Sequence, residues 1–479
     1  MKRECVIRYS LKSLRTLDGW RAFFMGRAYP ILVAALVLFG NLTALDYYVN
    51  FAVTLLFAFA MVVCDSIRPA IITVCTYIYQ ISIPHAPSYP TYSDFIFSGW
   101  RKPVSVCILI FIAFFFIFFF VKKRIYSKMS IKKTPLLLPL TVFSLVMLLN
   151  GAFSSDWTYK NLIFAFLNIL VYFFLYFIIL YGFSEKETHR EIVDYFVYIS
   201  LLMALIIICE MSHLYLTSDK IFVDGAIDKE RVALGWGIWN LMGNSISVLI
   251  PTLFIGAAYA RRSLSFWLYF GTATLSWVFA VLTMSRNALV FSTLIYAASI
   301  LLLCFVGQRK KIFRIIVALG MLGCALFVVV FFGKIKMLLG DYFERGFSDN
   351  GRYALWTLAI DTFKGSFVFG NGFYGFFTTE VFEFGAVPRM AHNTVFEILA
   401  AMGTVGILGY LYYRFKAVML FVRRPSISKT LLGFSVLVFL LGSLLDNFVF
   451  NIQPALYYTV IMAIVARAEM NGSSFDDLE

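Results

Sequence analysis

Charged residues are scarce in this sequence of 479 residues. They make up only 14% of it, whereas hydrophobic residues make up 61% and aromatic residues 18%. A water-soluble chain of this length ordinarily carries about 25% charged residues. The composition therefore excludes a soluble globular protein and predicts a membrane protein.

Cysteine and histidine are also sparse, and their spacing does not suit metal binding. The seven cysteines include no Cys-x-x-Cys pair, and no two of the four histidines lie at ligand spacing. All cysteines but Cys5 lie within apolar runs, where cysteine behaves as a small core residue. The predicted outer loops also lack an Asp-x-Asp pair that would bind a divalent cation. We therefore predict no disulfide, no metal site and no cofactor.

The apolar residues form long runs, and these runs determine the fold class. Runs such as 104–121 and 162–180 are each long enough to cross a hydrocarbon core roughly 30 Å thick. The alternating pattern of a membrane β-barrel is absent, and lipid tolerates no open sheet. We predict an all-α fold, a polytopic transmembrane helical bundle of 12 to 14 spans. The candidate spans are 30–48, 50–64, 66–83, 104–121, 135–152, 161–182, 192–210, 237–259, 264–283, 288–306, 315–333, 393–413, 429–446 and 452–466.

The distribution of lysine and arginine predicts the orientation of these spans. The segment 122–133 carries six basic residues, and short loops with such an excess are cytoplasmic. If spans alternate outward from this segment, the basic clusters at 261–262, 309–314 and 414–429 also fall inside. Both termini are then cytoplasmic, and no lysine or arginine lies in mid-bilayer. The net charge of +14 thus reflects orientation and attraction to anionic lipid headgroups, not nucleic-acid binding.

One predicted outer segment stands out by its length. It covers about sixty residues, 333–392, and long structured loops are usually functional. We divide the chain into N-terminal transmembrane helices (1–220), a candidate catalytic region that includes this loop (221–414), and C-terminal transmembrane helices with a cytoplasmic tail (415–479).

The long loop contains the pattern of a short helix. Cap candidates come first, an apolar stripe at helical spacing follows, and Gly365 is a stop signal. The caps are Ser348, Asp349 and Asn350, and the stripe is Leu355, Trp356, Ala359, Ile360 and Phe363. The stripe is most simply a packing face, with direct ligand binding as the alternative. Arg352 in the first turn is either a solvated charge beside Asp349 or, with the free N–H groups of the helix start, part of a phosphate site.

A second polar cluster lies where the loop meets the next span. His392 at the outer boundary is either a helix cap or a general base, because its unperturbed pKa lies near working pH. Asn393 and Glu397 follow at i, i+4 spacing, about one turn into the bilayer, where an ionisable group is by default a functional candidate. Gly403, Gly406 and Gly409 further along are interpreted as a close helix-packing face.

Two more arginines and two glycines complete the candidate set. Arg286 lies in a short outer turn, and Arg231 lies just before a span. Snorkelling explains either arginine alone, but arginines and a histidine at the mouths of different spans indicate a converging anionic site. Gly370 and Gly372 begin a Gly-x-Gly-x-x-Gly pattern without βαβ context, so a dinucleotide site is excluded. They suit a close turn or a sugar-stacking surface.

The order of these motifs resembles the bacterial O-antigen ligase and O-antigen polymerase family. It runs from Arg231 and Gly243-Asn244 through Ser285-Arg286-Asn287, Gly351-Arg352 with Trp356 and Gly370-Asn-Gly372 to His392-Asn393 with Glu397 and Gly403 through Gly406. The resemblance covers roughly residues 228–413. It implies a membrane glycosyltransferase of the bacterial inner membrane with its site on the extracytoplasmic side. It further implies that Arg286 and Arg352 hold a diphosphate and that His392 activates the acceptor or completes the anionic site, with Arg231 in a looser match.

The resemblance also implies the substrates. The donor is a glycan on undecaprenyl diphosphate, and the acceptor is another lipid-linked glycan in a polymerase or lipid A core in a ligase. We favour the polymerase and keep the ligase as an alternative. Membrane lipid and other polysaccharide assembly proteins are candidate partners. A polysaccharide flippase or other transporter is the rival from another class, but it normally needs charged or broken helices at the midplane.

Overall fold

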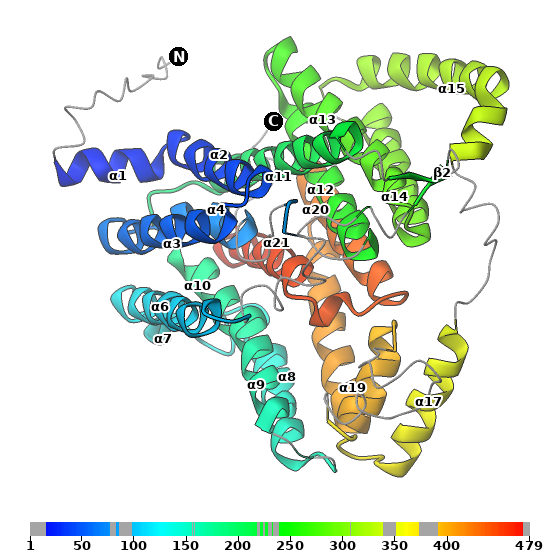
Figure 1. The fold of residues 1–479 in the computed structure, drawn as a ribbon. Coiled ribbons are helices and arrows are strands. Elements are labelled where there is room, and N and C mark those ends of the chain that lie inside the picture. The colour runs from blue at the N-terminus through cyan, green and yellow to red at the C-terminus, as the bar shows by residue number, and fades with distance from the viewer. Residues whose placement is uncertain are drawn as a thin grey trace.

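The structure is a computed structural model of an almost entirely helical chain (Figure 1). It describes residues 16–76, 83–85, 98–155, 157, 159–217, 221–223, 226–228, 232, 239–306, 308–338, 351–372 and 391–472. The helices of the first half are α1 (Leu17–Met25), α2 (Ala28–Leu42), α3 (Asp46–Val63), α4 (Arg68–Thr76), α6 (Arg101–Lys122), α7 (Ile125–Lys128), α8 (Leu137–Phe153), α9 (Tyr159–Ile169), η3 (Leu170–Phe174), α10 (Leu175–Gly182) and α11 (His189–Thr217).

A two-residue antiparallel ladder separates the two halves. It pairs β1 (Phe222–Val223) with β2 (Ala226–Ile227). The helices that follow are α12 (Trp239–Tyr259), α13 (Ser263–Leu282), α14 (Arg286–Phe305), α15 (Lys310–Leu338), α17 (Arg352–Gly365), α19 (Thr394–Val422), α20 (Ile427–Ser443), η5 (Phe448–Phe450) and α21 (Ile452–Asn471). The prediction of an all-α fold is confirmed.

Eight helices of the described residues are long and apolar enough to cross a membrane, or nine if the bent pair α1 and α2 forms one span. Two shorter apolar helices, α8 and α20, add to this set. Together with the composition, these helices make the chain an integral membrane protein. The range of 12 to 14 spans stays a prediction, and so does the extracytoplasmic placement of the long loop.

Most predicted spans coincide with a helix, but one boundary is wrong. The predicted spans 30–48 and 50–64 meet in the wrong place, because α2 ends at Leu42 and α3 begins at Asp46. Helices α15 and α19 extend beyond the predicted spans 315–333 and 393–413, to Leu338 and Val422.

Arg414 lies within α19, one residue beyond the predicted span 393–413. Its side chain is only 7% exposed, and its guanidinium carbon lies 4.8 to 5.0 Å from the ring centroids of Tyr410, Tyr413 and Tyr458. Aromatic faces attract a cation electrostatically, most strongly where water is excluded. The tyrosines thus stabilise this buried charge.

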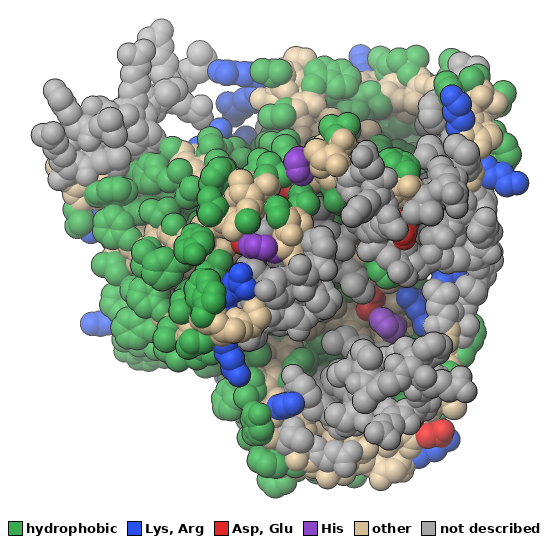
Figure 2. All heavy atoms as spheres, in the orientation of Figure 1, with side chains coloured by type: hydrophobic (Ala, Val, Ile, Leu, Met, Phe, Trp, Pro, Cys, Tyr) green, Lys and Arg blue, Asp and Glu red, His purple; other side chains and the backbone are tan. Residues whose placement is uncertain are grey.

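Helix α12 lies at the centre of the second half. It packs against α11, α13, α14 and α20, and most of its residues are buried. Small residues permit this close packing; a Cβ atom on Gly243, for example, would lie 2.5 Å from the Cβ of Ala288. In contrast, α6 exposes Ile110, Phe114 and Ile117. Figure 2 shows hydrophobic side chains over much of the side formed by the N-terminal helices, as expected of a lipid-facing surface.

Two interrupted helices shape the region near the candidate site. The span Tyr159–Gly182 contains a π-helical turn, η3, from which the Tyr172 hydroxyl donates to the carbonyl of Val449 at 2.6 Å. Helix α19 is broken at Gly403, whose φ of 63° and ψ of −159° are essentially restricted to glycine. The break corrects the interpretation of Gly403 as part of a continuous packing face, whereas Gly409 does lie close to Val146 of α8.

Candidate active site

The turn between α20 and η5 is the point on which the candidate residues converge. This 444–447 turn consists of Leu444, Leu445, Asp446 and Asn447. Its carbonyl groups accept hydrogen bonds from two asparagines at the starts of other helices. Asn393 Nδ2 donates to Leu444 at 2.8 Å, and Asn287 Nδ2 donates to Leu445 at 3.4 Å. The turn thus connects the starts of α14 and α19.

His392 lies directly against this turn. Its Nδ1 atom is 3.3 Å from Asp446 Oδ1, which also accepts a hydrogen bond from the backbone N–H of Asn447 at 2.8 Å. The Asp446 side chain is 7% exposed and that of His392 is 35% exposed. A carboxylate at Nδ1 favours the tautomer with its proton on that atom, so the Nε2 atom has a free lone pair. The pair can therefore take up a proton from a bound hydroxyl group.

Backbone conformation fixes the direction of the imidazole. His392 adopts φ 49°, in the left-handed region that few residues other than glycine occupy. The residue after it, Asn393, caps α19 by accepting hydrogen bonds from the N–H groups of Val395 and Phe396 through its side-chain oxygen. The cap and the contact with the 444–447 turn hold this strained residue in place.

Glu397 joins the loop end to the 444–447 turn. Its Oε2 atom accepts hydrogen bonds from the backbone N–H of Ala391 at 2.8 Å and from Asn447 Nδ2 at 3.0 Å. The side chain is buried. These two hydrogen bonds join the residue before His392 to the 444–447 turn, and the hydrogen bond from Asn393 to Leu444 joins the residue after it to the same turn.

Arg352 and Arg286 bring positive charge to the same place. Each is the first residue of a helix, α17 and α14 respectively, and helix starts attract anions through their free N–H groups. Burial lowers the pKa of the half-buried Arg352; the Asp446 carboxylate acts in the opposite direction, and the charge of Arg286 lowers the pKa further. Two guanidinium groups and the carboxylate thus interact electrostatically. An arginine stays protonated despite such a shift, because the guanidinium group is a very weak acid.

Trp356 attaches α17 to α19. Its Nε1 atom donates to the carbonyl of Ala391 at 3.0 Å, and its ring stacks on Phe396 with centroids 5.2 Å apart. Arg352 lies one helical turn before Trp356. The contact of Trp356 with Ala391 and Phe396 therefore sets the distance between Arg352 and His392. Leu355 and Ala359 of the predicted stripe are buried, which confirms a packing face there, whereas Ile360 is 38% exposed.

The boundaries of α17 follow the prediction at only one end. The helix ends at Gly365, as predicted. It begins at Arg352 after Gly351, whose left-handed φ of 76° turns the chain into the helix without a side-chain cap. The predicted caps Ser348, Asp349 and Asn350 lie outside the described residues, as does Arg231.

Gly370 and Gly372 lie in the break of α19. The N–H groups of Asn371 and Gly372 donate to the carbonyls of Ala400 and Ala401, each at 2.9 Å. Both glycines have left-handed φ values, and a Cβ atom on Gly370 would lie 2.5 Å from the carbonyl carbon of Ala401. The segment 367–372 thus supplies partners for backbone groups that the break leaves open. This is the close turn predicted for Gly370 and Gly372.

Sequence reasoning did not include Asp446 in the site. The sequence shows it only as an acidic residue near the outer edge of a span, and its contact with His392 joins residues 54 positions apart. An acidic residue at the end of a predicted span was the one available signal. Figure 2 shows a histidine beside acidic and basic side chains in a recess of this face.

The fold and the site together define a class: a helical integral membrane protein with a histidine–aspartate pair and two arginines at converging helix ends. Residues 271–411 match the family model described as O-antigen ligase. The match agrees with the resemblance noted from the sequence and supports glycan transfer of the O-antigen ligase or polymerase type. It contains Arg286, Arg352 and His392 but ends before Asp446. No curated protein matches the chain.

Proposed function

We propose that this protein transfers a glycan from undecaprenyl diphosphate to an acceptor hydroxyl at the outer face of the bacterial cytoplasmic membrane. The observation that carries the proposal is the convergence of Arg286, Arg352 and the His392–Asp446 pair on the 444–447 turn. Three of these residues lie within the O-antigen ligase match.

The arginines suit a diphosphate leaving group. In the proposed reaction, the acceptor oxygen bonds to the anomeric carbon while the bond from that carbon to the phosphate oxygen breaks. The electron pair of the broken bond stays on the diphosphate, so negative charge develops there. Preorganised cations stabilise such charge in the transition state, and a guanidinium binds phosphate through two parallel hydrogen bonds. The lipid diphosphate is itself the activated donor, so the reaction consumes no nucleotide.

His392 would take the proton that the acceptor hydroxyl loses. Its Nδ1 atom faces Asp446, so Nε2 is the atom available to the hydroxyl. The Asp446 carboxylate then stabilises the imidazolium, as in other histidine–aspartate pairs. A positioned general base contributes on the order of 10²- to 10⁴-fold to the rate. His392, Arg286 and Arg352 are the proposed catalytic residues.

The acceptor separates two forms of this function. In our preferred form, the protein is a polymerase whose acceptor is a second lipid-linked glycan. The second candidate is a ligase that transfers the glycan to lipid A core, and the description of the matched family favours it. Both forms use the same donor site, so the arginine and histidine assignments do not depend on this choice.

Glycan profiling of a deletion strain tests the proposal and separates the two forms. A polymerase deletion loses long chains and retains single units, whereas a ligase deletion accumulates long chains that are not attached to lipid A core. Complementation with the unaltered gene restores the profile, and complementation with His392→Ala or Arg352→Ala does not. Immunoblotting checks that both variants insert at normal abundance. Normal glycans in both variants would refute the enzymatic assignment, and intracellular accumulation of untranslocated donor would favour a flippase.

A further inference from the structure

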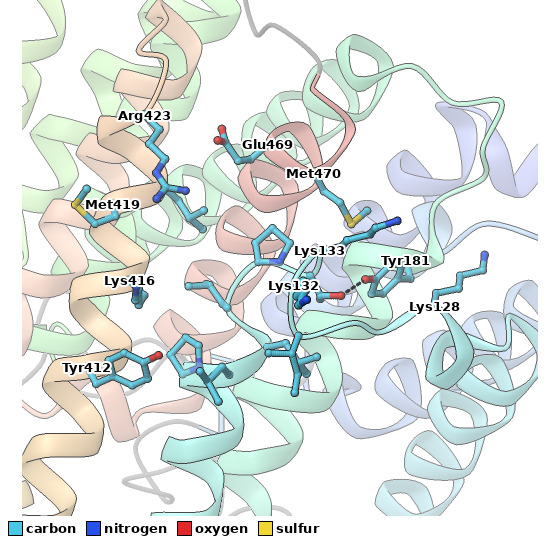
Figure 3. Close-up of a pocket in the computed structure, with 18 residues that line it drawn as sticks. Lys128, Lys132, Lys133, Tyr181, Tyr412, Lys416, Met419, Arg423, Glu469 and Met470 are labelled. Atoms are coloured by element: carbon cyan, nitrogen blue, oxygen red, sulfur yellow. Dashed lines mark hydrogen bonds between the residues drawn. The ribbon is translucent and has the colours of Figure 1, made fainter.

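A pocket of about 650 Å³ lies far from the candidate active site. Figure 3 shows that α19, the end of α21 and the segment before α8 surround it. Residues of the last turns of α19, among them Lys416 and Arg423, line one side, and Lys132 lines another. Its volume is that of a site for a small molecule or a lipid headgroup.

The pocket lies at the opposite ends of the helices that form the active site. Helix α19 begins beside His392 and reaches the pocket with its last turns, and α8 begins in the pocket and ends at Phe153. Ser155, just after α8, bonds to Asn371 near the break of α19. If the active site faces outward, the pocket therefore faces the cytoplasm. The positive-inside pattern of 122–133 predicts the same side.

The lining is strongly basic and its one carboxylate is already paired. The pocket contains Lys128, Lys132, Lys133, Lys416 and Arg423, but only one acidic residue, Glu469. Lys429 forms an ion pair with Glu469 at 3.6 Å. Among the described residues, no carboxylate forms an ion pair with Lys132, Lys133, Lys416 or Arg423. Lys128 does form an ion pair, with Glu185 at 3.9 Å. The pocket thus offers four cations without an ion-pair partner among the described residues.

The segment that carries Lys132 and Lys133 is held by specific contacts. Thr134 Oγ1 lies 2.6 Å from the Tyr181 hydroxyl, and the Tyr176 hydroxyl donates to the carbonyl of Pro135 at 2.9 Å. Leu136 then takes a left-handed φ of 60° to enter α8. These contacts fix one wall of the pocket, so less conformational entropy is lost when a ligand binds.

Apolar side chains line the same cavity beside the cations. They include Leu137 and Leu138 from α8 and Met419 and Leu420 from α19. A free phosphate ion would leave this apolar surface unused, whereas a phospholipid presents phosphate and acyl chain together. Basic pockets between transmembrane helices on the cytoplasmic side bind anionic lipid headgroups. We propose that this pocket binds an anionic phospholipid of the cytoplasmic leaflet, with Lys132 and Lys416 at its phosphate.

Lipid binding to the purified full-length protein tests the proposal without any measure of glycan transfer. Diphosphatidylglycerol is added to the protein in detergent, and the bound fraction is measured by native mass spectrometry. The test variant is Lys132→Gln/Lys416→Gln, and the matched control is Lys310→Gln/Lys311→Gln, which removes two exposed lysines from the same predicted face outside the pocket. A basic residue near an anionic headgroup contributes about fivefold to binding, so the test variant should bind roughly 25-fold more weakly. The control should bind like the unaltered protein.

Several outcomes would overturn the proposal. Equal losses in both double variants would mean that the basic face attracts lipid without a pocket, and no loss in either would remove the lysines from the site. Displacement of the lipid by an equal concentration of inorganic phosphate would identify a general anion site.

The chain ends in the acidic residues Asp476, Asp477 and Glu479, so the measurement is repeated on a chain truncated after Gly472. If only the truncated chain binds lipid, the tail is the occupant. Monodisperse elution of each variant confirms that it is folded.

Discussion

At the residue scale, Asp446 determines what His392 can do. Its carboxylate faces Nδ1 at 3.3 Å, and a negative charge there both orients the imidazole and stabilises its protonated form. We expect Asp446→Asn to lower the rate of glycan transfer about 10²-fold or more, because the charge and the tautomer preference are lost. Turnover of the purified protein measures this. Asp361→Asn removes an exposed carboxylate of α17 and should leave turnover unchanged; equal losses in both variants would contradict the role of Asp446.

Arg352 provides a test based on pH. Burial and Arg286 lower the pKa of the Arg352 side chain more than Asp446 raises it. A lysine at this position starts from an ordinary pKa of about 10.4, and the same environment would lower that pKa. A cation is lost as the pH rises through its pKa. Arg352→Lys should therefore keep part of its activity near neutral pH and lose it at alkaline pH, where the unaltered protein stays active. If the activity of Arg352→Lys and that of the unaltered protein depended on pH in the same way, this description of the electrostatic environment would be refuted.

The sequence identifies individual residues of the site more readily than the contacts between those residues. Arg286, Arg352 and His392 are ionisable residues at the ends of apolar runs, which makes them visible without a structure. The 444–447 turn is not visible in this way, because its contacts with Asn287 and Asn393 join segments that are 158 and 51 residues away. The surroundings of Arg414 are not visible for a related reason. The tyrosines that surround it come from both its own helix and α21, and a local pattern cannot show the second group.

At the scale of elements, the break in α19 is the feature most sensitive to a small change. A Cβ atom on Gly403 would lie 2.4 Å from the carbonyl oxygen of Val368, and its backbone conformation is strained for any residue with a side chain. Gly403→Ala should destabilise the protein by about 1–3 kcal/mol and release the segment 367–372. A thermal melt in detergent measures the shift. Gly365→Ala is the control, since a Cβ atom there meets nothing within 4 Å; equal melting temperatures in both variants would contradict the account.

Helices were predicted more reliably than their interruptions. Apolar runs of about twenty residues specify spans such as α12, α13 and α14 to within two residues at each end, because lipid leaves the backbone no alternative to helical hydrogen bonds. The same rule predicts no break at Gly403. The break exists because another segment supplies the hydrogen-bond partners: the carbonyls of Phe367 and Val368 accept, and the N–H groups of Asn371 and Gly372 donate. Asn150 of α8 adds a donor to Ala401. Such partners become known only with the tertiary structure.

At the scale of the whole molecule, the two ends of the bundle have different chemistry. One end carries the histidine–aspartate pair and the arginines, and the other carries the basic pocket. We expect these ends to lie on opposite sides of the membrane. In a cysteine-free background, Asp361→Cys in intact cells should react with a membrane-impermeant maleimide, whereas Lys132→Cys should react only after permeabilisation. Both positions are exposed. Labelling of Lys132→Cys alone in intact cells would invert the predicted orientation and place the active site in the cytoplasm.

The most direct test of the central claim is the affinity of the purified protein for its lipid diphosphate donor. We compare the unaltered protein with Arg286→Gln/Arg352→Gln and with Arg261→Gln/Arg262→Gln, a control that removes two arginines of the opposite predicted face. Hydrogen bonds to charged groups contribute about 1.5–3 kcal/mol each, so the first variant should bind undecaprenyl diphosphate at least about 100-fold more weakly. The control should bind normally. Unchanged affinity in Arg286→Gln/Arg352→Gln would contradict the account, because the two arginines would then not hold the diphosphate.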